Sequence, residues 1–82
     1  MNISLFPTLA MKNRSVVEKS TNVGCYHCLK IFSSKDIKEY TDDGKTVICP
    51  LCEIDAIVGD NNVPELCEEI LKKANHFWFK KP

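Results

Sequence analysis

A long apolar run is missing from this 82-residue sequence. A membrane-spanning helix needs roughly 20 consecutive apolar residues, and no stretch of the chain approaches that length, so no membrane association is expected. The N-terminal stretch MNISLFPTLAMKNR also lacks an early positive charge, and Pro7 interrupts its apolar residues. It is therefore not expected to act as an export signal. These absences favour a cytoplasmic protein, in which cysteine thiols stay reduced.

An excess of either charge is missing too, because 11 basic residues balance 11 acidic ones. This balance removes the simplest argument for a nucleic-acid partner. The charges are unevenly spread: residues 1–38 carry six bases and two acids, residues 39–69 one base and nine acids, and residues 70–82 four bases and no acid. The acidic block is expected either to be a solvated surface or to form one negative face that steers a basic protein partner.

Cysteine, in contrast, is abundant, with five residues in the chain. Four of them form two Cys-x-x-Cys pairs, Cys25 with Cys28 and Cys49 with Cys52, and twenty residues separate the pairs. This spacing is typical of a zinc site, because each tight turn directs two sulfurs to one point and four thiolates complete a tetrahedral shell. We predict that these four cysteines bind one structural Zn²⁺, which would support a core that is marginal at this chain length.

Two enzymatic interpretations of the cysteines are less favoured. Cys25-Tyr26-His27-Cys28 has the form of a redox dithiol in which His27 would lower a thiol pKa, but such a dithiol belongs in a βαβ domain with one active pair. A catalytic zinc keeps an open coordination position, and the His-x-Glu signature of zinc deaminases is absent. The sequence therefore indicates a protein that is not an enzyme and has no evident small-molecule substrate. Both histidines, His27 and His76, are expected at the surface.

Local patterns divide the chain into a loose N-terminal segment, residues 1–12, and a single zinc-binding domain, residues 13–82. Ser15 and Glu18 have the spacing of a capping box, and Asn13 can also cap, so a short helix is predicted near residues 13–20. Gly24 is expected to turn the chain into the first cysteine pair. Beyond that pair, Leu29, Ile31 and Phe32 predict a short strand or turn that packs over the metal. Ser33 and Asp36 then predict a single helical turn.

A β-hairpin is predicted between the cysteine pairs, where Asp43-Gly44 separates two β-prone runs. A two-residue turn there imposes three pairs across the hairpin, the first of them an ion pair: Asp42 with Lys45, Thr41 with Thr46, and Tyr40 with Val47. The returning strand would then deliver Cys49 to the metal site.

The C-terminal residues predict a long helix. Asn62 can cap it, Glu65 completes the capping box, and Pro64 suits the first turn. Apolar residues form one stripe at helical spacing, at positions 63, 66, 67, 70, 71, 74, 77 and 78, and this stripe predicts a core position for Cys67. Two i,i+4 ion pairs support the helix, Glu68 with Lys72 and Glu69 with Lys73. The predicted fold is small α+β: a zinc-ribbon or treble-clef-like β-hairpin metal centre packed against this long helix.

The segments NRSVVEKS, GCYHCLKIF and ICPLCEIDAIVGD, with Trp78-Phe79, resemble a family of small uncharacterised cytoplasmic proteins of bacteria and their phages. In that family Cys-x-x-Cys-Leu precedes a hairpin, then Cys-Pro-x-Cys-Gly-Ile-Asp, and a helix that ends in Trp-Phe. The resemblance covers residues 13–79 and implies a zinc-ribbon or treble-clef-like protein, with no established activity. Glu53 stands where the family has Gly. Glycine would suit a knuckle with positive φ, whereas glutamate fits a short helix that begins at Cys52, as in a treble clef.

The predicted function is that of a non-enzymatic zinc-binding module that binds another macromolecule, with a protein as the favoured partner. The alternative is a nucleic-acid-binding zinc ribbon, a transcription-associated regulator, that uses the basic ends of the chain and Phe79 with Lys80 and Lys81. Packing in the core is the competing role for the C-terminal aromatic residues, Phe77 and Trp78 above all. A dithiol redox protein is the third interpretation.

Overall fold

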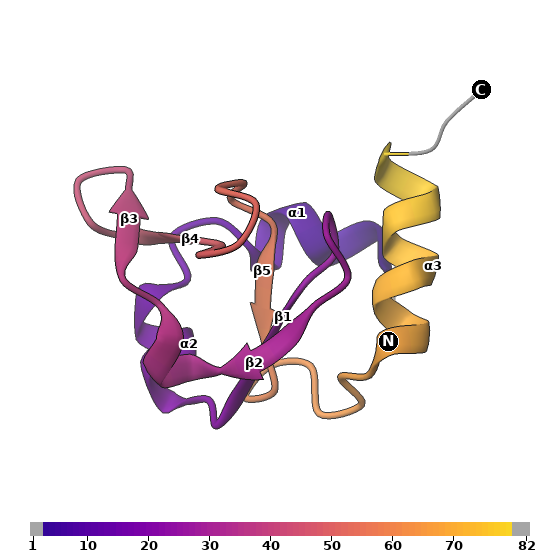
Figure 1. Cartoon of the computed structure of the whole chain (residues 1–82), viewed down its shortest axis with the longest axis horizontal. Coiled ribbons are helices and arrows are strands. Elements are labelled where there is room, and N and C mark those ends of the chain that lie inside the picture. The colour runs from indigo at the N-terminus through magenta and orange to yellow at the C-terminus, as the bar shows by residue number, and fades with distance from the viewer. Residues whose placement is uncertain (1–2, 80–82) are drawn as a thin grey trace.

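A computed structural model describes residues 3–79, which form two antiparallel sheets with helical segments around them. In the three-stranded sheet β1 (Asn22–Cys25) lies between β2 (Ile31–Ser33) and β5 (Ile57–Gly59); in the other, β3 (Glu39–Thr41) pairs with β4 (Thr46–Ile48). The helical segments are η1 (Ile3–Leu5), α1 (Phe6–Leu9), α2 (Arg14–Lys19), η2 (Ser34–Asp36) and α3 (Glu68–Phe79). Helix α3 and the β3–β4 hairpin lie at opposite ends of the long axis (Figure 1). The predicted α+β fold is confirmed.

The N-terminal segment is packed over residues 3–10, whereas the sequence predicts a loose segment. Phe6 is fully buried, and its ring packs edge-on against Tyr26 with 5.5 Å between centroids. The indole N–H of Trp78 donates to the carbonyl of Ile3 at 2.9 Å, which ties the segment to α3. Full burial of one large apolar side chain stabilises by about 1.5–3 kcal/mol. Phe6 can therefore fix the segment in place, although its sequence has no hydrophobic periodicity from which this packing could be predicted. The domain boundary at residue 13 stays a prediction.

Helix α2 confirms the predicted short helix, but its predicted capping is wrong. Asn13 occupies the N-cap position without capping the helix. Its buried side chain instead donates from Nδ2 to the carbonyl of Ile57 at 2.8 Å and accepts at Oδ1 from the amide of Val47 at 3.2 Å. Asn13 therefore joins β4 to β5, which belong to different sheets. Glu18, expected to complete a capping box, pairs with Arg14 at 3.3 Å.

The predicted β3–β4 hairpin is confirmed, including its register, because residues 39–41 pair with residues 48–46 as the turn requires. Asp42, Asp43 and Gly44 have positive φ, at 57°, 57° and 83°, a conformation that Gly adopts freely and Asp tolerates better than most residues. At the turn, a hydrogen bond takes the place of the predicted ion pair: Asp42 Oδ2 accepts from Thr46 Oγ1 at 3.1 Å.

Gly24 lies within β1 and not at a turn. A Cβ atom at this position would lie 2.8 Å from Leu71 Cδ1 and 3.1 Å from Leu66 Cδ1. A larger residue here would therefore force the side chains of Leu71 and Leu66 to shift. The short strand and helical turn predicted after the first cysteine pair are confirmed as β2 and η2, and the Ser33 side chain caps the turn.

Helix α3 begins at Glu68, later than the cap predicted at Asn62. Residues 60–67 form turns, in which the amide of Val63 donates to the carbonyl of Gly59 at 3.0 Å. Val63 is fully buried directly after β5, so tertiary burial overrides the local capping pattern. The predicted ion pairs are confirmed at 3.2 Å for Glu68–Lys72 and 3.7 Å for Glu69–Lys73. Within residues 3–79, no helix combines the length and apolarity needed to cross a membrane.

Candidate metal centre

The two Cys-x-x-Cys pairs meet at one place in the fold. The first pair lies in the turn between β1 and β2, and the second in the connection between β4 and β5. The four sulfur atoms all lie within 4.8 Å of one another, an arrangement that could hold a metal ion and that has no counterpart elsewhere in residues 3–79. The structure thus brings together the four residues that the spacing singled out: Cys25, Cys28, Cys49 and Cys52.

The distances between sulfur atoms are those of ligands around one ion. Cys25 Sγ lies 3.6 Å from Cys52 Sγ, and Cys28 Sγ lies 3.7 Å from Cys49 Sγ. A tetrahedron with metal–sulfur bonds of about 2.3 Å has edges of ~3.8 Å, whereas a disulfide requires about 2.05 Å. Both of these distances join a cysteine of one pair to a cysteine of the other. The donor set and its geometry fit a single tetrahedral ion with soft ligands.

The two pairs are held by the same backbone hydrogen bonds, and we call residues 25–30 and 49–54 the first and second knuckle. In both, the amide of the fifth residue donates to the carbonyl of the first cysteine, at 2.8 Å and 2.9 Å. The amide of that cysteine in turn donates to the carbonyl of the sixth residue, at 3.0 Å in each knuckle. The centre is therefore assembled from two copies of one local geometry.

The residue after each second cysteine adopts a left-handed conformation. Leu29 has φ 68° and Glu53 has φ 64°, which carries the chain sharply out of each knuckle. After Cys52 the chain passes through Glu53 into β5, and residues 52–59 contain no helix. The short helix expected for a treble clef is thus absent from this segment, and the centre is ribbon-like. Glutamate here adopts the conformation for which glycine is the natural residue.

Backbone amides point at two of the sulfur atoms. The amides of His27 and Cys28 each donate to Cys25 Sγ at 3.4 Å, and the amide of Leu51 donates to Cys49 Sγ at 3.4 Å. Such bonds favour the thiolate, which is the form that binds metals.

Burial opposes ionisation of the same thiols. Burial raises the pKa of Cys25 and of Cys52. At Cys49 burial also acts to raise the pKa, but hydrogen bonds from the backbone amides of Cys52 and Leu51 and from the side chains of Cys52 and Cys28 together outweigh it, and the pKa is lowered. The protein alone therefore does not favour four thiolates, and a cation at their centre would supply the missing stabilisation.

Asn75 supports the first knuckle, a role that the sequence did not reveal. Its side chain is buried in α3, and Nδ2 donates to the carbonyls of Tyr26 and His27, at 3.0 Å each. These carbonyls lie between the two cysteines of the first pair, so α3 clamps the turn that presents them. The only sequence signal is an amide residue directly after an apolar position of the predicted helix stripe.

The apolar stripe predicted for α3 is partly wrong. The face buried against the sheet carries Leu71, Ala74 and Asn75, with Trp78 partly buried beside them. Phe77, expected in the core, has 44% of its surface exposed. Cys67, also expected in the core, is exposed and precedes the first residue of the helix. The buried face of the helix is thus narrower than the predicted apolar stripe, and it includes the side chain of Asn75.

The remaining candidate residues lie at the surface as expected, and one of them is packed. His27 and His76 are exposed. Phe79 is 45% exposed, and its ring lies against Tyr26 and His27, with centroids 5.5 Å and 4.9 Å apart. Lys80 and Lys81, which the nucleic-acid interpretation needs, lie outside the described residues.

Acids of the acidic block lie at both ends of β5. Asp60 follows β5, where it accepts hydrogen bonds from the amides of Thr21 and Asn22 at 3.0 Å each. Asp55 precedes β5 and instead lines a cavity together with Asp42 of the hairpin turn. The strand therefore lies between Asp55 and Asp60. Basic residues lie beside Asp42, because the amide of Lys12 donates to Thr46 and the side chain of Arg14 donates to the carbonyl of Gly44.

No protein-family model, curated protein or solved structure matches the chain. The resemblance seen in the sequence thus rests on its motifs, of which the structure bears out the four-cysteine cluster. An origin in bacteria or phages stays a prediction.

Proposed function

We propose that this chain is a small zinc-binding module in which one Zn²⁺, bound by Cys25, Cys28, Cys49 and Cys52, has a structural role. The observation that carries the proposal is the cluster of four sulfur atoms within 4.8 Å of one another. Four sulfur ligands fill a tetrahedral shell and leave no coordination position for water or substrate, which is the arrangement of structural zinc. On this proposal the protein is not an enzyme, and the ion serves the fold.

The module, as we propose it, acts by binding another macromolecule, and a protein is the favoured class. Two features support this choice over a nucleic acid. Lys72 and Lys73 of α3 each pair with an acid of the same helix, which reduces the positive charge offered to phosphates. Asp42 and Asp55 line one cavity, and carboxylates repel the phosphates of a nucleic acid and attract basic side chains of a protein.

Native mass spectrometry tests the metal proposal. We expect one zinc per chain. A tetrahedral four-cysteine site suits either zinc or iron, and colour separates the two, because an iron centre absorbs visible light and a zinc centre is colourless. Cys49→Ser should lose the metal, and Cys67→Ala, the matched control, should keep it. A folded protein without metal, or one containing iron, would contradict the proposal.

Capture of a partner from cell extract tests the second part. Charge reversal at Asp55, in the variant Asp55→Lys, should weaken capture while metal content is unchanged. Reversal at Glu68, an exposed acid of α3, is the matched control and should have little effect. Capture that requires RNA or DNA, and that weakens steeply with salt, would support the nucleic-acid alternative instead.

A further inference from the structure

Strand β2 is an edge strand, with β1 on one side of it and no strand of residues 3–79 on the other. The amide of Cys25 donates to the carbonyl of Lys30 at 3.0 Å, and the amide of Ser34 donates to the carbonyl of Thr21 at 3.1 Å. Alternate residues of an antiparallel strand bond to the same neighbour. The even-numbered residues between these two bonds therefore face β1, and the odd-numbered ones turn their backbone groups away from it.

Three backbone groups of β2 are consequently open: the amide and the carbonyl of Ile31 and the amide of Ser33. No hydrogen bond within residues 3–79 engages any of them, and the side chain of Ile31 is exposed. Donors and acceptors that alternate along a strand edge match the backbone of another extended chain. The open edge therefore specifies the conformation of whatever pairs with it.

A groove adjoins the same strand and extends to the second knuckle. Its volume is about 310 Å³, at the lower end of the roughly 300–1,000 Å³ of pockets for small molecules, so it has room for a side chain. Leu51 on its wall is 64% exposed. The apolar part of the lining comes from β2 and the second knuckle, and the polar part from the segment after β2: Phe32, Pro50 and Leu51, then Asp36, Lys38 and Glu39.

The metal centre holds both parts of this surface. The amide of Leu51 donates to Cys49 Sγ at 3.4 Å, which fixes the outer wall of the groove on the second knuckle. Strand β2 begins directly after the first knuckle. The edge and the groove are therefore placed next to each other only when the two knuckles are joined.

The charges around β2 indicate which extended segment suits it. Lys30 and Lys35 lie just beyond the two ends of the strand, both are exposed, and none of the ion pairs within residues 3–79 uses either. A second copy of the chain, paired antiparallel through β2, would bring Lys30 of one copy near Lys35 of the other, and like charges across strands are destabilising. A segment with an acid at each end is instead complementary. At the groove, where Asp36 and Glu39 accompany Lys38, an uncharged side chain fits better than an acid.

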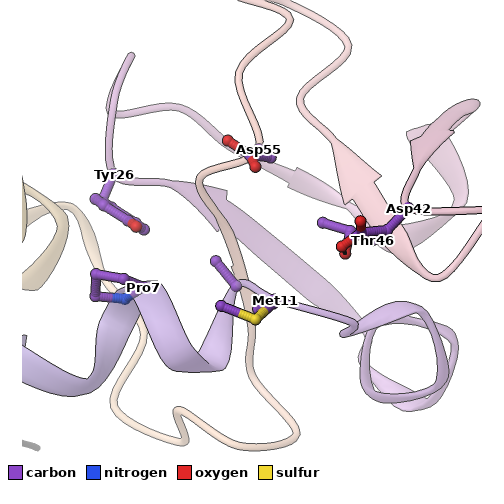
Figure 2. Close-up of a pocket in the computed structure, with 7 residues that line it drawn as sticks. Pro7, Met11, Tyr26, Asp42, Thr46 and Asp55 are labelled. Atoms are coloured by element: carbon purple, nitrogen blue, oxygen red, sulfur yellow. Dashed lines mark hydrogen bonds between the residues drawn. The ribbon is translucent and has the colours of Figure 1, made fainter.

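We propose that an extended, acidic segment of the protein partner adds to the open edge of β2 and places an apolar side chain in the adjoining groove. The residue opposite Phe32 in the added strand would project from the same face of the sheet as Phe32, which lines the groove. This inference rests on the proposed protein-binding function and adds a second contact to it. The cavity that Asp42 and Asp55 line, drawn in Figure 2, shares no residue with the groove.

An NMR titration of the metal-loaded full chain tests the inference, with the capped pentapeptide Glu-Thr-Leu-Thr-Glu as the probe. In an antiparallel pair its leucine lies opposite Phe32 and its threonines opposite Ile31 and Ser33. We expect saturable shifts of the amide signals of Ile31 and Ser33 and slower hydrogen exchange at both, because each amide gains an acceptor. The same peptide N-methylated at both threonines cannot donate to the carbonyl of Ile31 and should not bind detectably.

Variants of exposed residues separate the groove from the charges. Leu51→Ser should weaken binding about fivefold or more, because the leucine of the peptide loses an apolar wall. Leu5→Ser, the matched control, removes an apolar side chain that is 48% exposed and lies outside the groove, so it should have little effect. Lys30→Glu combined with Lys35→Glu should reverse the preference, so that Lys-Thr-Leu-Thr-Lys binds more tightly than the acidic peptide.

Several results would overturn the inference: no saturable change at Ile31 and Ser33, equal binding of the N-methylated peptide, an equal loss in Leu5→Ser, or no change of preference in the charge-reversed variant. Ile31 signals that shift with protein concentration alone would assign the edge to a second copy of the chain and overturn it as well. Capture from cell extract separates the two proposals. A protein that captures a partner while both amides keep their exchange rates would contradict this inference alone, whereas failure to capture any protein would contradict the protein-binding function.

Discussion

At the scale of single residues, the metal centre depends on two left-handed positions that are not glycine. Leu29 and Glu53 have φ 68° and 64°, and a side chain in this conformation costs about 1 kcal/mol. Both are held there by the hydrogen bonds that their amides donate to the first cysteine of the knuckle. The strain is thus local, and the surrounding knuckle stabilises it.

Replacing Glu53 by glycine should therefore stabilise the metal-loaded protein. Glu53 is exposed, so the substitution relieves the backbone without loss of packing, and we expect a gain of about 0.5–1 kcal/mol in the free energy of unfolding. Denaturant unfolding measures it. Leu29→Gly is the informative comparison, because the same relief there is offset by the loss of a partly buried side chain. A less stable Glu53→Gly variant would show that the glutamate side chain contributes to the fold.

The reactivity of Cys67 provides a second test at this scale. Cys67 is exposed, whereas the four cysteines of the centre are buried or partly buried. In the metal-loaded protein we expect a thiol reagent to modify one cysteine rapidly and all five only after addition of a chelator and denaturant. Cys67→Ala should abolish the rapid phase and change stability by less than about 0.5 kcal/mol. A rapid phase that survives in this variant would mean that a ligand cysteine is free.

The four candidate ligands could be predicted because a knuckle is a local structure, in which spacing alone determines where two sulfurs lie. Asn75 could not be predicted in the same way. It acts on a carbonyl 49 positions earlier in the chain. Such roles arise from tertiary structure and leave no periodic signal.

At the scale of elements, prediction succeeded where the decisive forces are local. The register of the β3–β4 hairpin followed from Asp43-Gly44 and was right to the residue. The start of α3 was wrong, because burial of Val63 outweighed the capping pattern at Asn62. The packing of α1 was missed, since it depends on Phe6 reaching Tyr26 across the fold.

Helix α3 is coupled to the metal centre through Asn75, which makes a third prediction. Asn75→Ala removes two hydrogen bonds and leaves the carbonyls of Tyr26 and His27 without them, so we expect a loss of about 1–3 kcal/mol in stability. The loosened knuckle should also release its metal to a chelator about 10–100-fold faster, as loss of supporting contacts does at other metal sites. A zinc indicator dye would follow the release.

The neighbouring residue His76 is the matched control for that experiment. It lies on the same helix but is exposed, so His76→Ala should change neither stability nor the rate of metal release appreciably. If Asn75→Ala lost stability and kept a normal release rate, Asn75 would stabilise the packing of α3 without supporting the centre.

At the scale of the whole molecule, the centre connects parts of the chain that also share one apolar core. The first knuckle joins β1 to β2 in one sheet, and the second receives β4 from the other sheet and passes the chain to β5. Asn13 makes one further link between the sheets, and Asn75 attaches α3 to the first knuckle. Both sheets and α3 are thus connected to the knuckles that carry the four sulfur atoms.

Removal of the metal should therefore release the whole fold and not only the knuckles. Structural zinc contributes about 10–16 kcal/mol of apparent binding free energy in small peptides, which is comparable with the total stability of a small domain, about 5–15 kcal/mol. Without the knuckles, α3 loses its clamp, and a helix of 12 residues is marginal by itself in water. Trp78, the only tryptophan, reports on this helix because its indole group contacts the N-terminal segment.

On addition of a chelator we expect loss of metal, loss of helical circular dichroism and a change in Trp78 fluorescence to proceed with one rate constant. Addition of zinc should restore all three signals. Cys67→Ala should behave as the unmodified protein, since its sulfur is not part of the cluster, whereas Cys49→Ser should show the metal-free signals from the start. If the fluorescence of Trp78 and the helical signal persisted after the metal had gone, α3 and the N-terminal segment would form a core that is stable without the ion, and the structural role proposed for zinc would be confined to the two knuckles.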